Sequence, residues 1–95
     1  MKDLLVSGSR FLTTDEVADA ILHYAQVLAQ YGRSDIVRFP ALVDGFPANS
    51  WLALGPISGS TLAAVEVIDS LIGTLEGASE ASAEIHRRSD RVEAP

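Results

Sequence analysis

Two histidines and the absence of cysteine limit the metal chemistry open to this chain. A catalytic zinc site usually takes three protein ligands, and neither His23 nor His86 has a second histidine three or four residues away. Asp19 precedes His23 by one helical turn, where a carboxylate can orient an imidazole ring. We interpret this pair as part of a solvent-exposed helix face, because polar residues share that face. The sequence therefore predicts no metal site, and the missing cysteines exclude disulfides and thiol nucleophiles.

Motifs for nucleophilic catalysis and phosphate binding are incomplete. The Ser-Gly-Ser segment at 58–60 lacks the second glycine of a Gly-x-Ser-x-Gly nucleophile elbow. The single lysine is Lys2, so the chain has no Gly-rich phosphate loop that ends in Gly-Lys. Carboxylate pairs at 15–16 and at 80 and 84 lie at the starts of predicted helices, where the helix dipole accounts for them. We therefore predict that the protein is not an enzyme and holds no cofactor.

The composition is that of one small folded domain. Of the 95 residues, 47% are apolar and 21% are charged, and 7 Lys plus Arg stand against 13 Asp plus Glu, a net charge of −6. Such a chain repels nucleic acid, because nonspecific binding needs cations that neutralise phosphates. No apolar run reaches the roughly 18–20 residues of a membrane span, and residues 1–12 lack the apolar core of a signal peptide. We expect a cytoplasmic protein with no nucleic-acid or membrane partner.

The clearest element is a helix over 14–31. Thr13 and Glu16 have the spacing of a capping box, and Gly32 follows as the expected left-handed stop. Apolar residues recur along one face at helical spacing. They are Val17, Ile21, Tyr24, Ala25, Leu28 and Tyr31.

The residues before this helix predict a β-hairpin. Short apolar runs at 3–6 and 10–13 flank a Ser-Gly-Ser segment, and Gly8 with Ser9 suits a two-residue turn. An isolated hairpin is marginal in water, so this one must pack against other elements.

Strand patterns follow the helix. Alternating apolar residues predict a strand over 35–43, and Pro40 places it at an edge or a bulge because proline cannot donate to the ladder. We expect a loop over 44–50 and a short return strand over 51–55.

The C-terminal third is ambiguous at first and then helical. The 57–76 stretch fits either a strand over about 61–67 followed by irregular chain, which we favour, or a continuous helix. Residues 79–91 predict a helix, with glutamates early and arginines late, as the helix dipole prefers.

Together these elements predict an α+β fold. It is a small two-layer sandwich with an N-terminal β-hairpin, a long amphipathic helix, an antiparallel sheet of three to five strands and a C-terminal helix. We assign 1–76 to a single compact domain and 77–95 to a C-terminal helix and tail. The apolar stripe of that last helix is thin, so we expect it to pack weakly.

An uncovered strand face is the strongest candidate for an interaction surface. Outward positions of the 35–43 strand carry apolar side chains, which a partner must bury if no helix covers them. Aromatic residues in the following segment belong to types enriched at interface hot spots. The candidate interaction residues are Ile36, Arg38, Leu42, Phe46 and Trp51. For Trp51 we favour the centre of the core, with the interface as the alternative.

The sequence thus favours a non-enzymatic protein-interaction or accessory module that acts as a homodimer, since two-fold dimers are the commonest soluble oligomers. An unidentified second protein is a further partner in this interpretation. The alternative is a small-ligand binding module, with a pocket between the 14–31 helix and the sheet that is lined by Tyr24, Tyr31 and Trp51.

Overall fold

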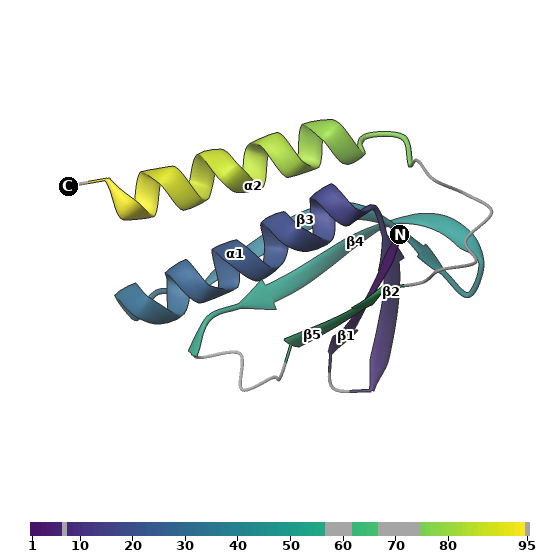
Figure 1. The fold of residues 1–95 in the computed structure, drawn as a ribbon, viewed down its shortest axis with the longest axis horizontal. Coiled ribbons are helices and arrows are strands. Elements are labelled where there is room, and N and C mark those ends of the chain that lie inside the picture. Colours follow the sequence, from purple (N-terminus) through teal and green to yellow (C-terminus); the bar gives the residue numbers. More distant parts are fainter. Residues whose placement is uncertain (7, 57–61, 67–74, 95) are drawn as a thin grey trace.

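The computed structural model describes residues 1–6, 8–56, 62–66 and 75–94. In chain order the elements are β1 (Lys2–Val6), β2 (Ser9–Thr13), α1 (Asp15–Tyr31), β3 (Asp35–Val43), β4 (Phe46–Leu54), β5 (Leu62–Glu66) and α2 (Ala78–Glu93). The strands of these residues form one five-stranded antiparallel sheet in the order β4-β3-β2-β1-β5. The two helices lie parallel to each other on the same side of the sheet (Figure 1). The predicted α+β fold is confirmed.

The N-terminal hairpin is present, with its turn one residue earlier than predicted. β1 and β2 pair from Lys2 opposite Thr13 to Val6 opposite Ser9. Ser9 is therefore a strand residue, and the prediction that it belongs to the turn is wrong. Gly8 ends the connection with a φ of 86°, a left-handed conformation that favours glycine.

α1 begins one residue later than its capping signal indicates. Thr14, not Thr13, caps the helix, because its hydroxyl oxygen accepts a hydrogen bond from the backbone N–H of Val17 at 3.3 Å. Thr13 ends β2 instead, and its hydroxyl donates to the carbonyl oxygen of Pro40 at 2.8 Å. This bond to β3 explains why Thr13 stays in the strand. At the other end Gly32 adopts the predicted left-handed conformation, with a φ of 65°.

β3 and β4 form one long hairpin, and the loop predicted over 44–50 is wrong. Val43 pairs with Phe46, so only Asp44 and Gly45 connect the strands. Both have a positive φ, 51° and 83°, as a type I′ turn requires, and Asp-Gly is a preferred sequence for that turn. β4 therefore begins directly after the turn, five residues earlier than predicted.

β3 is joined to its two neighbours unequally. Its whole length pairs with β4, whereas β2 pairs with it only between Leu12 and Leu42. Pro40 lies just past this single bridge, where its missing N–H removes no hydrogen bond to β2. β3 lies inside the sheet between β4 and β2, so the prediction that Pro40 marks an edge strand is wrong. The proline is tolerated because the short contact with β2 does not extend to it.

The C-terminal elements follow the favoured interpretation. β5 confirms the strand predicted over 61–67, while 57–61 and 67–74 lie outside the described residues. The helix predicted over 79–91 is α2. It packs against α1 and β3 more closely than its thin apolar stripe indicates, because Ile85 belongs to the buried core.

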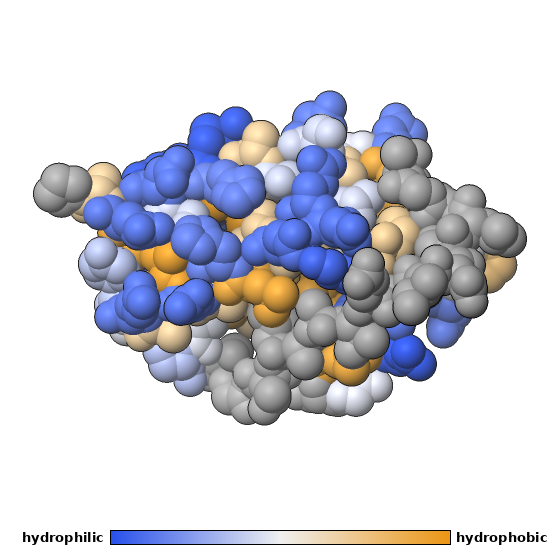
Figure 2. Space-filling model, viewed as in Figure 1, coloured by the Kyte–Doolittle hydropathy of each residue, from blue (hydrophilic) through white to orange (hydrophobic). Residues whose placement is uncertain are grey.

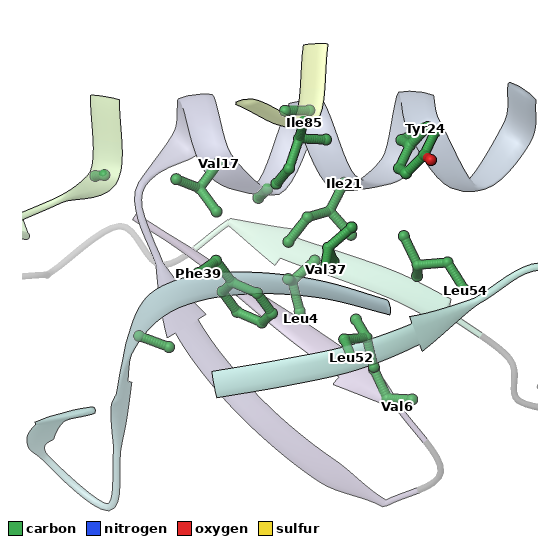
Figure 3. Close-up of a cluster of buried hydrophobic side chains, with 14 of the residues drawn as sticks. Leu4, Val6, Val17, Ile21, Tyr24, Val37, Phe39, Leu52, Leu54 and Ile85 are labelled. Carbon is green, nitrogen blue, oxygen red and sulfur yellow. The ribbon is translucent and has the colours of Figure 1, made fainter. Parts of the chain in front are cut away.

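The core lies between the sheet and the two helices (Figure 3). Every layer contributes side chains that are at most 2% exposed: Leu4 of β1, Phe39 of β3, Ile21 of α1 and Ile85 of α2. The ring of Phe39 also meets that of Phe11 edge to face, with centroids 6.0 Å apart. The surface over the helices is mainly hydrophilic (Figure 2). The helices therefore cover one face of the β3–β4 hairpin, and the described residues leave its other face open.

Gly55 provides a test of how the end of β4 packs. It has a φ of 112°, and a Cβ there would lie 2.9 Å from the Cα of Ser34 and closer still to the carbonyl oxygen of Arg33. We expect Gly55→Ala to lower the free energy of unfolding by roughly 2 kcal/mol or more, measured by urea denaturation, because the backbone must move. Gly45→Ala is the matched control, since its φ is also positive but open space surrounds its Cβ. Equal losses from the two variants would contradict the clash.

Candidate functional site

The candidate site lies on the face of the β3–β4 hairpin that points away from the helices, which we call the outer face. Side chains alternate along a strand, so residues between the buried core positions of β3 point outward. The antiparallel register places Trp51 opposite Arg38 and Ala53 opposite Ile36. The outer face comprises Ile36, Arg38, Pro40 and Leu42 of β3 with Pro47, Asn49, Trp51 and Ala53 of β4.

Three of the five predicted interaction residues meet on this face. The guanidinium of Arg38 lies over the indole of Trp51, 5.8 Å from the ring centroid, in a cation–π contact. Ile36 is 60% exposed and Trp51 62% exposed. The prediction that Trp51 occupies the centre of the core is wrong, because its place in the β4 alternation turns it away from the helices.

The other two predicted residues, Leu42 and Phe46, do not join this exposed cluster. Leu42 belongs to the outer face but is only 7% exposed, since it sits between Leu12 of β2 and Pro47 of β4 in the ladder. Phe46 is 74% exposed, but it falls on the opposite side of β4, at the tip of the hairpin. Neither residue therefore joins the exposed surface formed by Ile36, Arg38 and Trp51.

Hydrogen bonds from α2 and β2 show which backbone carbonyls of β3 point away from β4. Arg88 Nη1 donates to the carbonyl oxygen of Ile36 at 3.0 Å, and Thr13 Oγ1 donates to that of Pro40 at 2.8 Å. Both carbonyls thus point away from β4, so these residues form non-hydrogen-bonded pairs with β4. The same alternation turns the backbone groups of the outer-face residues of β4 toward its open edge.

β4 is the outermost strand on its side of the sheet, and none of its nine residues is charged. Edge strands usually carry charges, often lysine, that prevent pairing with other chains. In β4 only Pro47 works against such pairing, because it lacks an N–H. A neutral edge that carries an exposed tryptophan and pairs with no other described strand is a surface suited to another strand.

Asp35, at the start of β3, joins three elements. Its carboxylate accepts hydrogen bonds from the Tyr24 hydroxyl of α1 at 2.7 Å, from the N–H of Ile36 at 2.8 Å and from Arg88 of α2 at 3.1 Å. Burial acts to raise the pKa of Asp35, but the three donors outweigh it and hold that pKa below its ordinary value. Burial and the bond to Asp35 raise the pKa of Tyr24 to about 12. This network holds α2 beside β3.

The aromatic pocket predicted between α1 and the sheet is absent, because its three residues do not converge. Tyr24 is buried, Tyr31 is 53% exposed and Trp51 lies on the outer face. The described residues instead line cavities beside α2. One, of about 430 Å³, lies at the C-terminal ends of the helices. Another, of about 390 Å³, lies between β3 and α2.

Asp19 and His23 also bind different partners. Asp19 Oδ1 lies 2.7 Å from Lys2 Nζ, and His23 Nε2 lies 3.4 Å from Glu93 Oε1. Among the described residues, no group of three or more His, Asp and Glu side chains is placed to hold a metal ion. None of the helices described is long and apolar enough to cross a membrane.

The Tyr24–Asp35 bond predicts an alkaline stability profile. A folded-state pKa above the ordinary value of about 10 contributes stability that is complete below pH 10 and is lost as pH rises toward about 12. We expect Tyr24→Phe to lower the free energy of unfolding at pH 7 by about 0.5–1.5 kcal/mol and to flatten this alkaline loss. Urea denaturation from pH 7 to pH 12 measures both, with the exposed Tyr31→Phe as control. An unchanged alkaline slope in Tyr24→Phe would rule out this role.

Comparison of the chain with protein-family models, with curated proteins and with solved structures finds no match. The geometry of the β3–β4 hairpin and of its neighbours is therefore the basis for the function proposed below.

Proposed function

We propose that the protein is a non-enzymatic protein-interaction module that acts as a homodimer through the open edge of β4. The observation that carries the proposal is the nine-residue edge strand β4, which has no charged residue and includes the exposed Trp51. An unpaired strand edge is a template for another strand.

Charge favours a second copy of the chain at this edge. Each copy carries a net charge of −6, so two copies repel each other over most approaches. β4 contributes none of that charge, and its neighbour on the outer face, Arg38, is a cation. Approach along β4 therefore brings the two copies together where repulsion is weakest.

Two-fold symmetry also suggests a register. If β4 pairs antiparallel with its own copy about Trp51, then Asn49 faces Ala53 of the second copy. Pro47 then lies opposite the residue that follows Leu54 in the second copy, beyond the end of that copy's β4. The missing N–H of Pro47 therefore removes no hydrogen bond between the two β4 strands. The two sheets join into one continuous sheet, and the two Trp51 side chains become neighbours across the interface.

Ala53→Pro tests this register. The N–H of Ala53 faces the open edge, so its removal leaves the β3–β4 ladder intact but removes two hydrogen bonds from the symmetric dimer. At about 0.5–1.5 kcal/mol for each bond, we expect the dimer Kd to rise roughly 5- to 150-fold. Sedimentation equilibrium measures the Kd, and native mass spectrometry measures the subunit count.

Ala53→Ser is the matched control, because it keeps the N–H and the size of the side chain nearly unchanged. A wild-type chain that stays monomeric, or an equal Kd for the Pro and Ser variants, would overturn the proposed interface.

Small-ligand binding is a second candidate function, favoured by the charges around the cavity of about 430 Å³. Arg33, Arg88 and Arg91 line it together with Ser34 and the carboxylates of Asp35 and Glu84. Arg88 is neutralised by its acidic partners, whereas Arg33 and Arg91 form no ion pair with any described residue. Two free guanidinium groups and a hydroxyl suit a small carboxylate or phosphate.

Titration with inorganic phosphate, followed by NMR of the backbone amides, tests this second function. We expect saturable shifts around Ser34 that are lost in an Arg33→Gln, Arg91→Gln double variant. Arg87→Gln is the control, because Arg87 binds Glu84 and does not line the cavity. Shifts that grow linearly with phosphate, or that match those caused by chloride, would exclude a specific anion site.

A further inference from the structure

The hairpin has a second free edge, along β3 where β2 no longer pairs with it. The backbone groups directed to this edge belong to Ile36, Arg38 and Pro40. The N–H of Ile36 donates to Asp35 Oδ1 at 2.8 Å, and its carbonyl accepts from Arg88 at 3.0 Å. Pro40 has no N–H, and its carbonyl accepts a hydrogen bond from the end of β2. At two of the three residues of this edge, every backbone N–H and C=O that is present is therefore hydrogen-bonded to a side chain.

Arg38 is the third residue, and its backbone N–H and C=O have no hydrogen-bond partner among the described residues. A donor and an acceptor presented side by side are the unit through which a strand binds an extended peptide. Arg38 also lines the cavity of about 390 Å³ between β3 and α2, so a ligand has access to it. Ligand pockets in proteins begin at about 300 Å³.

This cavity, which we call the acidic groove, has an apolar floor and an acidic wall. Phe39 and Ile85 belong both to its lining and to the buried core. Glu76, Glu80 and Glu84 line it from the start of α2 and the turn before it. Glu80 and Glu84 are four residues apart on α2 and therefore share one side of the helix, while Glu76 lies in the turn before it.

Two of these carboxylates are free to bind a cation. Glu84 already binds Arg87 at 2.7 Å and Arg88 at 3.3 Å. Glu76 and Glu80 are exposed and form no ion pair with any described residue.

Two cations line the groove as well: Arg88 is paired with Asp35 and Glu84, and the guanidinium of Arg38 lies over Trp51 on the outer face. The acidic groove therefore combines three carboxylates against two guanidinium groups, a buried apolar floor and one open backbone donor–acceptor pair.

We propose that the acidic groove binds a short extended peptide segment of a partner protein that carries a Lys or Arg side chain. One residue of the segment exchanges two hydrogen bonds with the backbone of Arg38. Its basic neighbour reaches Glu80 and Glu76, and an apolar side chain covers the floor. The side chains that satisfy Ile36 and Pro40 close the edge at both ends, about 13 Å apart, so only about three residues pair. The groove is separate from the open edge of β4 and does not depend on dimer formation.

The unbound protein tests the geometry first. Because backbone groups alternate in direction along a strand, the amides of Val37 and Phe39 hydrogen-bond to β4, whereas the amide of Arg38 points away from it. We expect the Arg38 amide to exchange its hydrogen with solvent at least about tenfold faster than its two neighbours, as measured by NMR. Equal protection of all three amides would overturn the proposal.

The probe for binding is the capped peptide Thr-Lys-Val-Val-Thr, in which the Lys and the second Val flank the residue that pairs with Arg38 and so both face the groove. Its charge-reversed control is Thr-Glu-Val-Val-Thr. We expect the lysine peptide to shift the Arg38 amide signal saturably and to slow its exchange, and the glutamate peptide to leave both unchanged. Saturable shifts centred away from the acidic groove, or no saturation, would overturn the proposal.

Two variants assign the contacts. Arg38→Pro removes a donor that the β3–β4 ladder does not use, so we expect about tenfold weaker peptide binding with the fold retained. Arg38→Ala keeps the N–H and is its matched control, expected to bind like the wild type. Glu80→Lys is expected to weaken binding about tenfold or more, and it remains decisive if the proline variant does not fold.

Binding that is unaffected by both Arg38→Pro and Glu80→Lys would contradict the site. A change of oligomeric mass in Arg38→Pro without any peptide binding would assign this edge to a second copy of the chain instead.

Discussion

The carboxylate of Asp35 is the contact on which the placement of the other elements depends. It binds α1 through Tyr24 and α2 through Arg88, at the point where β3 begins. Arg88 also reaches the backbone of β3, so α2 lies next to the part of this strand that β2 does not pair with. The space that remains between β3 and α2 is the acidic groove. A partly buried ion pair is a weak source of stability by itself, but here it fixes where a helix lies.

The two edges of the β3–β4 hairpin differ because different elements lie beside them. Side chains from α2 and from the end of β2 reach β3 and bond its carbonyls. Among the described residues no strand lies beyond β4, and no described side chain bonds the outward backbone groups of β4. Charge follows the same division. The surface over the helices is mainly hydrophilic (Figure 2). β4, in contrast, carries no charged residue. A neutral edge is where two acidic copies repel least.

Local signals predicted most of the elements, and they failed where a tertiary bond competed with them. The 14–31 helix, its Gly32 stop and the N-terminal hairpin all follow from short-range patterns. The capping signal was one residue early, because Thr13 bonds to β3 and leaves Thr14 as the cap. Within the loop expected over 44–50, Asp44 and Gly45 form a two-residue turn, for which they are a preferred pair, and 46–50 is strand. This Asp-Gly pair by itself predicts a two-residue turn and therefore a strand that starts at Phe46.

By itself the sequence determined the fold class, the alternation of β3 and the absence of a recognisable catalytic motif, because these depend on residue type and spacing along one segment. It placed Ile36 and Arg38 on one face of a strand, but not Trp51 beside them. Only the tertiary structure decided that, since the register with β4 brings Trp51 over Arg38 and turns it away from the core. The burial of Leu42 and the unpaired backbone of Arg38 were also decided by tertiary structure. Both depend on where β2 stops pairing with β3, which is a contact between distant segments that no local pattern encodes.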